Sequence, residues 1–419
     1  MEGKRKLLVG FDLSEEFSQI SCFSYKTLEP VSICPNEKEE NGFIPTVLYL
    51  RGDTDVWLYG NEAIAAAAAD QKEPIVSLLT KICAGEEIRV YEKSYTPVAL
   101  LEKFLRKTLM LIKNYFPTEP ITRIVITIQT METKLVEGIY EALELLGILK
   151  DRATVISHES SYLSYVVNQD KSLWLNDVGL FDFDEEGLLY SQIKVNRKTQ
   201  PFIAGISQTA YADTIRYDMK KEQPDQLKYA FEQFTKTVLY KQVVSTLYFT
   251  GTGFEGNWAE SVIKSLCAGR RVFMGQNLYT KGACYAAKDM AGEGKKDVAV
   301  LGEEMITNTV TLQVYQDTAI REFPLIEALV PWYEVNRSVE VILDDATELN
   351  IMKRNIFNGD VVEHNLTLNP RLHRKNRMTR LKLSITCKDT KKAKINIMDL
   401  GFGEFEPGTN RDYEYMIEI

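Results

Sequence analysis

The sequence has no long apolar run and contains few cysteines and histidines. No stretch approaches the roughly 20 apolar residues that a membrane-spanning helix needs, and the apolar segment from Leu7 to Phe11 is too short for a signal peptide. The six cysteines form no C-x-x-C pair, and the three histidines have no metal-ligand spacing. These absences predict a cytoplasmic protein with free thiols and no membrane association.

Charge is unevenly distributed along the 419 residues. The net charge is −9, but the segment from Lys353 to Lys394 holds twelve Lys and Arg residues and three acids, so it carries +9 and the remainder carries −18. One interpretation is a face that binds an anionic partner, an acidic protein or a nucleic acid. The other is a set of solvated strand faces and hairpin tips. Within 371–380, the residues proposed for such a face are Arg371, Arg374, Lys375, Arg377 and Arg380.

A short acidic motif occurs twice, each time after an apolar strand-like run. Residues 11–16 read FDLSEE and residues 181–187 read FDFDEEG, at a constant offset of 170. Both copies are followed by Ser-Gln-Ile. A chain of this length is expected to hold two or three domains, and the repeat indicates that it contains two similar parts.

The apolar pattern extends this repeat. Residues 121–147 and 246–267 each predict a strand, a turn and a helix, and each unit follows one copy of the acidic hairpin. The pattern therefore predicts an α/β architecture of two similar halves with a cleft between them. Residues 292–297 are charged and contain glycine, which is typical of a linker, and the alternating runs beyond them predict an all-β domain.

Several stretches, taken in chain order, resemble the actin-like ATPase superfamily and specifically the 70-kDa heat-shock chaperones. In the first half these are GFDLSEE at the first phosphate loop, KICAG in the segment of the catalytic lysine, and VISHESSYLSYVV in the segment of the catalytic glutamate. In the second half they are LFDFDEEG at the second phosphate loop, TGTGFEGNWAESVIKSL at the adenosine motif, and NLYTKGACYAA at the closing helix.

The resemblance implies a fold class and domain limits. The fold would be a duplicated actin-like (ribonuclease H-like) two-lobe ATPase fold, followed by a C-terminal all-β domain similar to the chaperone substrate-binding β domain. Lobe I would span residues 1–195, and lobe II, with a shortened helical subdomain, residues 196–291. A linker, 292–297, would lead to the β domain, 298–419.

The resemblance also implies site residues. The catalytic groups would be Asp12, Lys81, Glu159 and Asp182. The turn that contacts the nucleotide would be formed by Gly251, Thr252 and Gly253. The candidate metal ligands are Asp12, Asp182 and Asp184.

The two acidic loops depart from the family pattern. The family has small or hydroxylated residues at the positions of 14–16 (Ser-Glu-Glu here) and glycines, which let the backbone approach phosphate, at those of 184–186 (Asp-Glu-Glu here). One unpaired carboxylate ~4 Å from a phosphate oxygen costs about 4 kcal/mol at an effective dielectric constant of about 20. Leu189 also replaces a family aspartate. We therefore expect a degenerate nucleotide site with no cofactor, in a chaperone-like protein that binds a protein partner or client.

Two other interpretations of the acids are open. They could hold Mg²⁺ that carries the phosphates, which would make the protein a divergent metal-dependent ATPase binding ATP. The order Asp182-x-Asp184-x-Glu186-Gly187 also imitates the start of an EF-hand calcium loop, although Ile193 stands where that loop needs a bidentate Glu.

Overall fold

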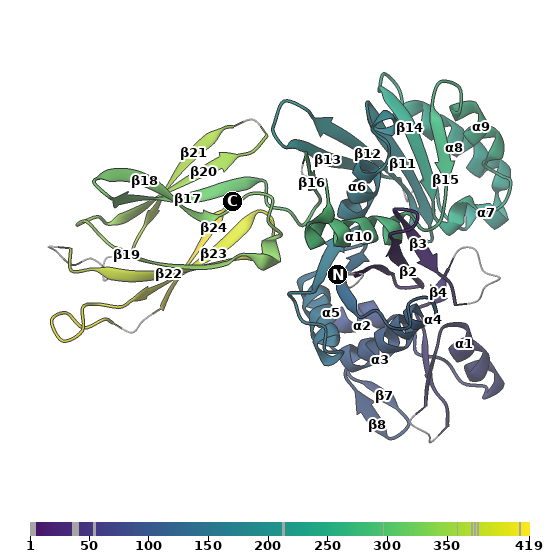
Figure 1. Cartoon of the computed structure of the whole chain (residues 1–419), viewed down its shortest axis with the longest axis horizontal. Helices are drawn as coiled ribbons and strands as arrows, with labels where there is room; N and C mark the ends of the chain where they lie inside the picture. Colours follow the sequence, from purple (N-terminus) through teal and green to yellow (C-terminus); the bar gives the residue numbers. More distant parts are fainter. Residues whose placement is uncertain are drawn as a thin grey trace. The chain divides into compact units, whose positions relative to one another are not determined.

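The computed structural model describes residues 6–35, 42–52, 56–211, 214–295, 297–357, 359–369, 372, 374, 377–409 and 412–419. The chain divides into two compact units, Met1–Gly302 and Glu303–Ile419 (Figure 1). The first unit combines helices with sheets, and the second is rich in strands. The predicted α/β class and strand-rich C-terminal region are thereby confirmed.

The first sheet of the first unit contains six strands. They are β1 (Leu7–Leu13), β2 (Phe17–Ser24), β3 (Glu29–Ile33), β4 (Ile44–Pro45), β9 (Ile121–Ile128) and β10 (Ala153–Ser157). The order is β10-β9-β1-β2-β3, and β4 also pairs with β2. The central strand β1 lies between the parallel β9 and the antiparallel β2, and all its residues are buried, as its apolar run requires.

The second sheet repeats this connectivity. Its strands are β11 (Asp177–Asp184), β12 (Gly187–Asn196), β13 (Phe202–Ala210), β14 (Val244–Thr250), β15 (Arg271–Met274) and β16 (Val298–Leu301). The order is β15-β14-β11-β12-β13-β16, with β11 between the parallel β14 and the antiparallel β12. Both acidic motifs thus lie where a central strand turns into its hairpin partner.

The last strand of this sheet lies within residues 298–419, which are predicted from the sequence to form the C-terminal domain. β16, at residues 298–301, pairs in parallel with β13, and the division between the units falls after Gly302. The apolar run Val-Ala-Val-Leu predicts a strand, but its local pattern does not indicate which sheet that strand joins.

Two helices join the sheets. α6 (His158–Asn168) packs against β13 and β16, α10 (Leu278–Lys288) packs against β1, β2 and β9, and the two helices contact each other. Glycine permits this close approach: a Cβ at Gly10 would overlap the carbonyl oxygen of Thr280, and one at Gly282 would overlap that of Ser161. The first turns of both helices are consequently held near the acidic hairpins.

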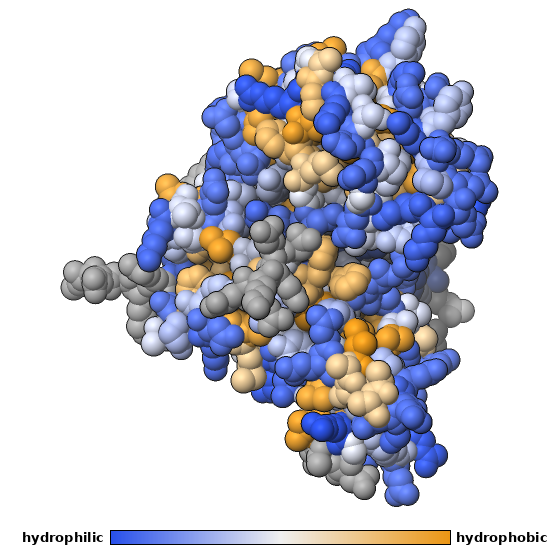
Figure 2. All heavy atoms as spheres, turned by 90° about the vertical axis from the view of Figure 1, so that its right-hand side faces the viewer, coloured by the Kyte–Doolittle hydropathy of each residue, from blue (hydrophilic) through white to orange (hydrophobic). Residues whose placement is uncertain are grey.

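The remaining elements of the first unit surround the sheets. They are α1 (Gly60–Ala69), α2 (Leu78–Ala84), α3 (Pro97–Met110), α4 (Ile112–Tyr115), α5 (Thr133–Leu145), α7 (Met219–Glu222), α8 (Pro224–Val238), α9 (Glu260–Leu266), β5 (Leu48–Leu50), β6 (Trp57–Tyr59), β7 (Ile88–Val90) and β8 (Lys93–Tyr95). The face shown in Figure 2 is mostly hydrophilic, with hydrophobic side chains in scattered groups. Over the described part of the chain, no helix is both long enough and apolar enough to cross a membrane.

The second unit consists of two four-stranded antiparallel sheets. One contains β17 (Asn308–Gln316), β18 (Ala319–Ile326), β20 (Glu348–Asn355) and β21 (Val361–Thr367), in the order β18-β17-β20-β21. The other contains β19 (Asn336–Ile342), β22 (Arg380–Cys387), β23 (Lys392–Asp399) and β24 (Asp412–Glu418), in that order. Alternate residues of these strands form a shared core that includes Leu312, Ile351, Leu381, Leu383, Ile395 and Ile397.

Candidate functional site: an acidic cleft

A cleft of about 280 Å³ lies where the two acidic turns meet in the first unit. The strands β1 and β11 are the central strands of their sheets, so their carboxyl ends deliver the repeated motifs to one place. Five of the predicted site residues line this cleft: Asp12, Asp182, Asp184, Gly251 and Thr252.

Each of the two loop aspartates is paired with an aromatic ring at the start of a helix. Oδ1 of Asp12 lies 2.8 Å from Nε2 of His158, in the first turn of α6. The hydroxyl of Tyr279, in the first turn of α10, donates to Oδ2 of Asp182 at 2.5 Å. The rings of His158 and Tyr279 stack, with centroids 4.0 Å apart and planes 9° from parallel. The four side chains therefore form a continuous row in the lining of the cleft.

Three carboxyl groups of the cleft, those of Glu16, Asp182 and Asp184, are held in surroundings that are unfavourable for negative charge. Burial, a hydrogen bond shared with Glu185 and the charges of the second turn raise the pKa of Glu16 to about 7. Burial and the neighbouring Asp182 raise the pKa of Asp184 to about 7 as well. Burial likewise raises the pKa of Asp182, although the hydrogen bond from Tyr279 opposes this. The cleft consequently favours protons or cations and disfavours anions.

The pKa of His158 is also raised. Burial by itself lowers the pKa of an imidazole, but the charge of Asp12 and the hydrogen bond to it outweigh that effect, and the charges of Asp182 and Asp184 add to it. The imidazolium form is therefore stabilised between the two turns.

Glu15, the remaining acid of the first turn, has a structural role. Its carboxylate accepts hydrogen bonds from the backbone N–H groups of Leu79 at 3.0 Å and Thr80 at 3.3 Å, at the start of α2. Such an acid satisfies free N–H groups of a first helical turn and interacts favourably with the helix dipole.

Two of the predicted catalytic residues lie outside the described lining of the cleft. Lys81 is in α2, and its ammonium group donates to the carbonyl of Val76 at 2.6 Å. Glu159 is in the first turn of α6, next to His158, but it is His158 that faces the cleft. The structure thus separates the lysine and the glutamate from the pair of aspartates.

The turn proposed to contact nucleotide is engaged by the protein's own side chains. The amide of Gln276 both accepts from the N–H of Gly251 and donates to its carbonyl, each at 3.0 Å. Lys220 donates to the carbonyl of Thr252 at 2.7 Å. Gly253 lies against the ring of Phe183, so closely that a Cβ there would overlap it. Gly251 and Gly253 are required by packing, and the backbone of Gly251 is already hydrogen-bonded.

The metal interpretation is not supported by any group of described side chains placed as metal ligands. Throughout the described ranges, no group of three or more His, Cys, Asp or Glu side chains is placed to hold a metal ion. Two of the acids are engaged in other contacts: Oδ1 of Asp184 accepts from the N–H of Glu186 at 2.9 Å, and Gln129 donates to the carboxylate of Glu186 at 2.6 Å.

Three side chains that line the cleft were not predicted from the sequence as site residues, namely His158, Tyr279 and Gln276. The signal that could have revealed the pair of rings is the repeat itself, since α6 and α10 follow the corresponding strands β10 and β15 of the two halves.

Three residues of the proposed basic face form ion pairs within the second unit. Arg374 binds the buried carboxylate of Asp399 at 2.6 Å and also pairs with Glu406. Arg377 pairs with Asp344, and Arg380 pairs with Glu340. Arg371 and Lys375 lie outside the described residues. The three described arginines thus bind acids of their own domain, as the interpretation of solvated strand faces and hairpin tips allows.

Comparison with known proteins places the chain in a family. A model described as "Family of unknown function (DUF5716) C-terminal" matches residues 29–303, and one described as "Domain of unknown function (DUF8552)" matches residues 305–419. Since the first match covers more than half of the chain, the protein belongs to the DUF5716 family. The two matched regions meet close to the structural division after Gly302. No curated protein matches the chain.

Proposed function

We propose that this protein is a chaperone-like, protein-binding factor built on a duplicated actin-like fold, with a degenerate nucleotide site. The duplicated fold is supported by the shared connectivity of the two six-stranded sheets and by the acidic hairpins at corresponding positions in them. The resemblance of the sequence to the 70-kDa heat-shock chaperones points in the same direction.

The observation that carries the proposal is the replacement of phosphate-binding groups by carboxyl groups. Glu16, Asp184, Glu185 and Glu186 line the cleft from both turns, and two of them already have a pKa of about 7 without any bound anion. A phosphate placed among them would add further negative charge, at about 4 kcal/mol for each unpaired contact near 4 Å.

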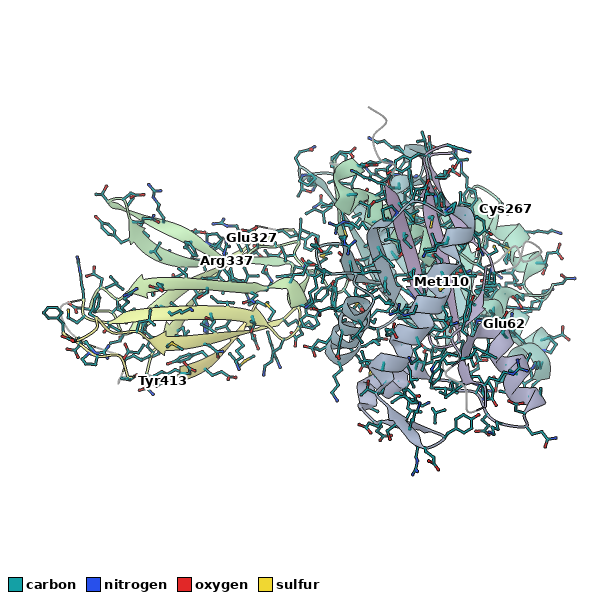
Figure 3. All side chains as sticks on the ribbon, turned by 60° about the horizontal axis from the view of Figure 1, so that its bottom comes forward. Glu62, Met110, Cys267, Glu327, Arg337 and Tyr413 are labelled. Carbon is teal, nitrogen blue, oxygen red and sulfur yellow. The ribbon has the colours of Figure 1, made fainter. Side chains whose placement is uncertain are left out.

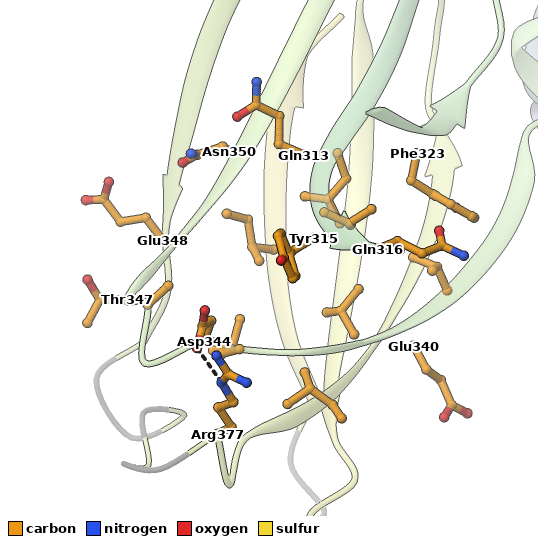
Figure 4. A pocket seen from close by; sticks show the side chains of 18 residues that line it. Gln313, Tyr315, Gln316, Phe323, Glu340, Asp344, Thr347, Glu348, Asn350 and Arg377 are labelled. Atoms are coloured by element: carbon orange, nitrogen blue, oxygen red, sulfur yellow. Dashed lines mark hydrogen bonds and ion pairs between the residues drawn. The ribbon is translucent and has the colours of Figure 1, made fainter. Parts of the chain in front are cut away.

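The protein-binding part of the proposal is supported by the second unit. A groove of about 850 Å³ opens between its two sheets and is lined by residues such as Val314, Phe323, Val339 and Val341 (Figure 4). This volume lies within the range of ligand sites in proteins. A groove that combines apolar side chains with polar ones on a β-sandwich is suited to a polypeptide partner.

Thermal unfolding in the presence of nucleotide tests the proposal. A ligand present at 100 times its dissociation constant stabilises the folded state by about 2.7 kcal/mol, so binding would raise the melting temperature measurably. We expect no increase with Mg-ATP, Mg-ADP or Ca²⁺. An increase with Mg-ATP would instead support the divergent metal-dependent ATPase, and the proposed degeneracy would be wrong.

A further inference from the structure

The second unit has an open sheet edge at β19. One side of β19 pairs with β22, and among the described strands none pairs with its other side. In an antiparallel sheet, alternate residues of an outer strand leave their N–H and C=O groups unpaired. This edge is therefore a template on which a further strand can form hydrogen bonds.

The usual protection of such an edge is weak in β19. Outer strands are commonly guarded by charged side chains or proline. The strand has two charged residues, and both are engaged elsewhere: Arg337 donates to the carbonyl of Pro324 at 2.8 Å and pairs with Glu327 (Figure 3), and Glu340 pairs with Arg380 on β22. Each of these charges is paired within its own domain, so neither stands at the edge as an uncompensated charge.

The groove runs beside this open edge. The inward-facing Val339 and Val341 of β19 are only partly buried, although Leu381 and Leu383 on the adjacent β22 are fully buried. Across the groove, Val314 and Phe323 are also partly buried, and Tyr315 is 72% exposed (Figure 4). The two sheets thus pack tightly along β22 and stand apart along β19, so apolar side chains of the core are left uncovered at this edge.

We propose that an extended segment of a partner protein adds to the free edge of β19 as a further strand and fills the groove with alternate apolar side chains. This inference rests on the proposed protein-binding function and specifies how the partner is held. Side chains of a strand point alternately to its two faces, so an added strand would cover Val314 and Phe323 with every second residue.

The charges of the rim define the polar face of the partner segment. Asp344 pairs with Arg377, and both residues line the groove. Glu340 also lines the groove, but its partner Arg380 lies outside the lining. Glu348 receives a hydrogen bond from the hydroxyl of Thr367 but has no ion pair among the described residues. The lining itself holds three acids (Glu340, Asp344 and Glu348) and one arginine (Arg377), so it is net negative, and we infer a partner strand whose polar residues are neutral or basic.

The test uses a fluorescein-labelled peptide, Lys-Val-Thr-Val-Thr-Val-Lys, and the full chain in a fluorescence anisotropy titration. We expect binding by the wild type and a loss of affinity of about tenfold or more with Val341→Glu, which places a charge in the groove. Val362→Glu is the matched control, because Val362 is on β21, the outer strand of the other sheet, and is 52% exposed. It should leave the affinity unchanged.

Backbone methylation of the peptide separates strand pairing from apolar contact. In one peptide the first, third and fifth amide nitrogens are methylated, and in another the second, fourth and sixth. Since only alternate N–H groups of an added strand face β19, one of these peptides should lose binding and the other should retain it. Equal binding by both would overturn the inference.

The outcomes also separate this inference from the proposed function. If the wild type binds no peptide while Mg-ATP still fails to stabilise it, strand addition at β19 is wrong and the degenerate nucleotide site stands. If sedimentation shows that the wild type self-associates and that Val341→Glu makes it monomeric, the occupant is a second copy of the chain and the inferred partner is wrong.

Discussion

At the scale of residues, the cleft contains carboxyl groups that are easier to protonate in the folded chain than in the unfolded one. Glu16 and Asp184 have a pKa of about 7, well above the ordinary values near 4. Because the folded state binds these protons more tightly, both groups favour folding at low pH. That contribution is lost as pH rises from about 4 through about 7.

The first prediction is that neutralising these groups stabilises the protein at alkaline pH. Between about pH 5 and about pH 8 the wild type should lose free energy of unfolding, and the variant Glu16→Gln/Asp184→Asn should lose less. At about pH 8 we expect the variant to be more stable by about 1 kcal/mol, a discounted figure because solvent screens the partly exposed Glu16. Urea denaturation at both pH values measures this. Equal pH dependence of the two proteins would contradict it.

The second prediction concerns His158, whose raised pKa acts in the same direction, since its contribution to stability is also lost as pH rises. A base with a raised pKa in the folded state contributes stability that is fully present below its ordinary pKa of about 6.5 and is lost as pH rises through the folded value. His158→Gln should therefore be more destabilising at about pH 6 than at about pH 9, by about 1 kcal/mol. Chemical denaturation at these two pH values provides the measurement.

Tyr279→Phe is the control for this second prediction. It also removes one hydrogen bond to a loop aspartate, but burial raises the pKa of Tyr279 well above its ordinary value, so the phenol stays neutral at both pH values. The hydrogen bond lowers the pKa of Asp182, so its loss should cost no less at about pH 9 than at about pH 6. A His158→Gln effect that is equal at the two pH values would show that the ring acts by packing alone.

At the scale of elements, the first unit depends on how closely α10 approaches α6 and β1. Gly282 lies against the carbonyl of Ser161 in α6, and Gly10 of β1 lies against that of Thr280 in α10. These contacts involve backbone atoms, which cannot rotate away as a side-chain tip can. The positions of His158 and Tyr279 follow from this packing.

The third prediction is that Gly282→Ala lowers the free energy of unfolding by about 1–3 kcal/mol or more, because the added methyl group forces the two helices apart. Gly205→Ala, in β13, serves as the control, since nothing lies within 4 Å of a Cβ there and its φ is not in the left-handed region. Thermal unfolding of both variants measures the difference. Similar melting temperatures would contradict the role assigned to Gly282.

The elements also show what sequence patterns can and cannot specify. Local sequence is enough to predict β1 and β9, which are continuous apolar runs, and α5, whose apolar residues recur at helical spacing. The partner of a strand is a long-range choice, and residues 298–301 were therefore assigned to the C-terminal domain although β16 pairs with β13. In the cleft the acids were visible in the sequence. The rings that bind them were not, because His158 and Tyr279 follow Asp12 and Asp182 at long and unequal distances in the chain.

At the scale of the whole molecule, the first unit places one acidic hairpin from each half at a shared cleft. If the carboxyl groups are what exclude nucleotide, their removal should restore part of its binding. Glu15 must be kept in any such design, because its carboxylate holds the start of α2. Gln276 also bears on nucleotide binding, because its amide is hydrogen-bonded to both the N–H and the C=O group of Gly251.

The fourth prediction is that the variant Glu16→Ser/Asp184→Gly/Glu185→Gly/Glu186→Gly binds Mg-ATP with a dissociation constant below about 1 mM, whereas the wild type does not. Adding Gln276→Ala should strengthen this binding by freeing the N–H of Gly251. Hydrolysis should return less fully than binding, because Leu189 replaces a family aspartate. Isothermal titration calorimetry measures the affinities.

A matched control removes the same number of charges outside the cleft. The exposed acids Glu62, Glu86, Glu87 and Glu137 can be replaced by Gln without touching the two turns, and this variant should not bind Mg-ATP. If the wild type binds Mg-ATP and the four-site cleft variant binds it less well, the acids are a metal site and the protein is a working ATPase.

The stacked rings of His158 and Tyr279 in the cleft lining give the molecule a natural spectroscopic probe. A histidine proton close to the face of a phenol ring resonates at an unusual field, and this displacement disappears when the rings move apart. The chain has only three histidines, and His158 is the one stacked on Tyr279 at 4.0 Å. The proton NMR signal of a single side chain can therefore follow the spacing of α6 and α10 in solution, without any label, while a partner is added to the protein.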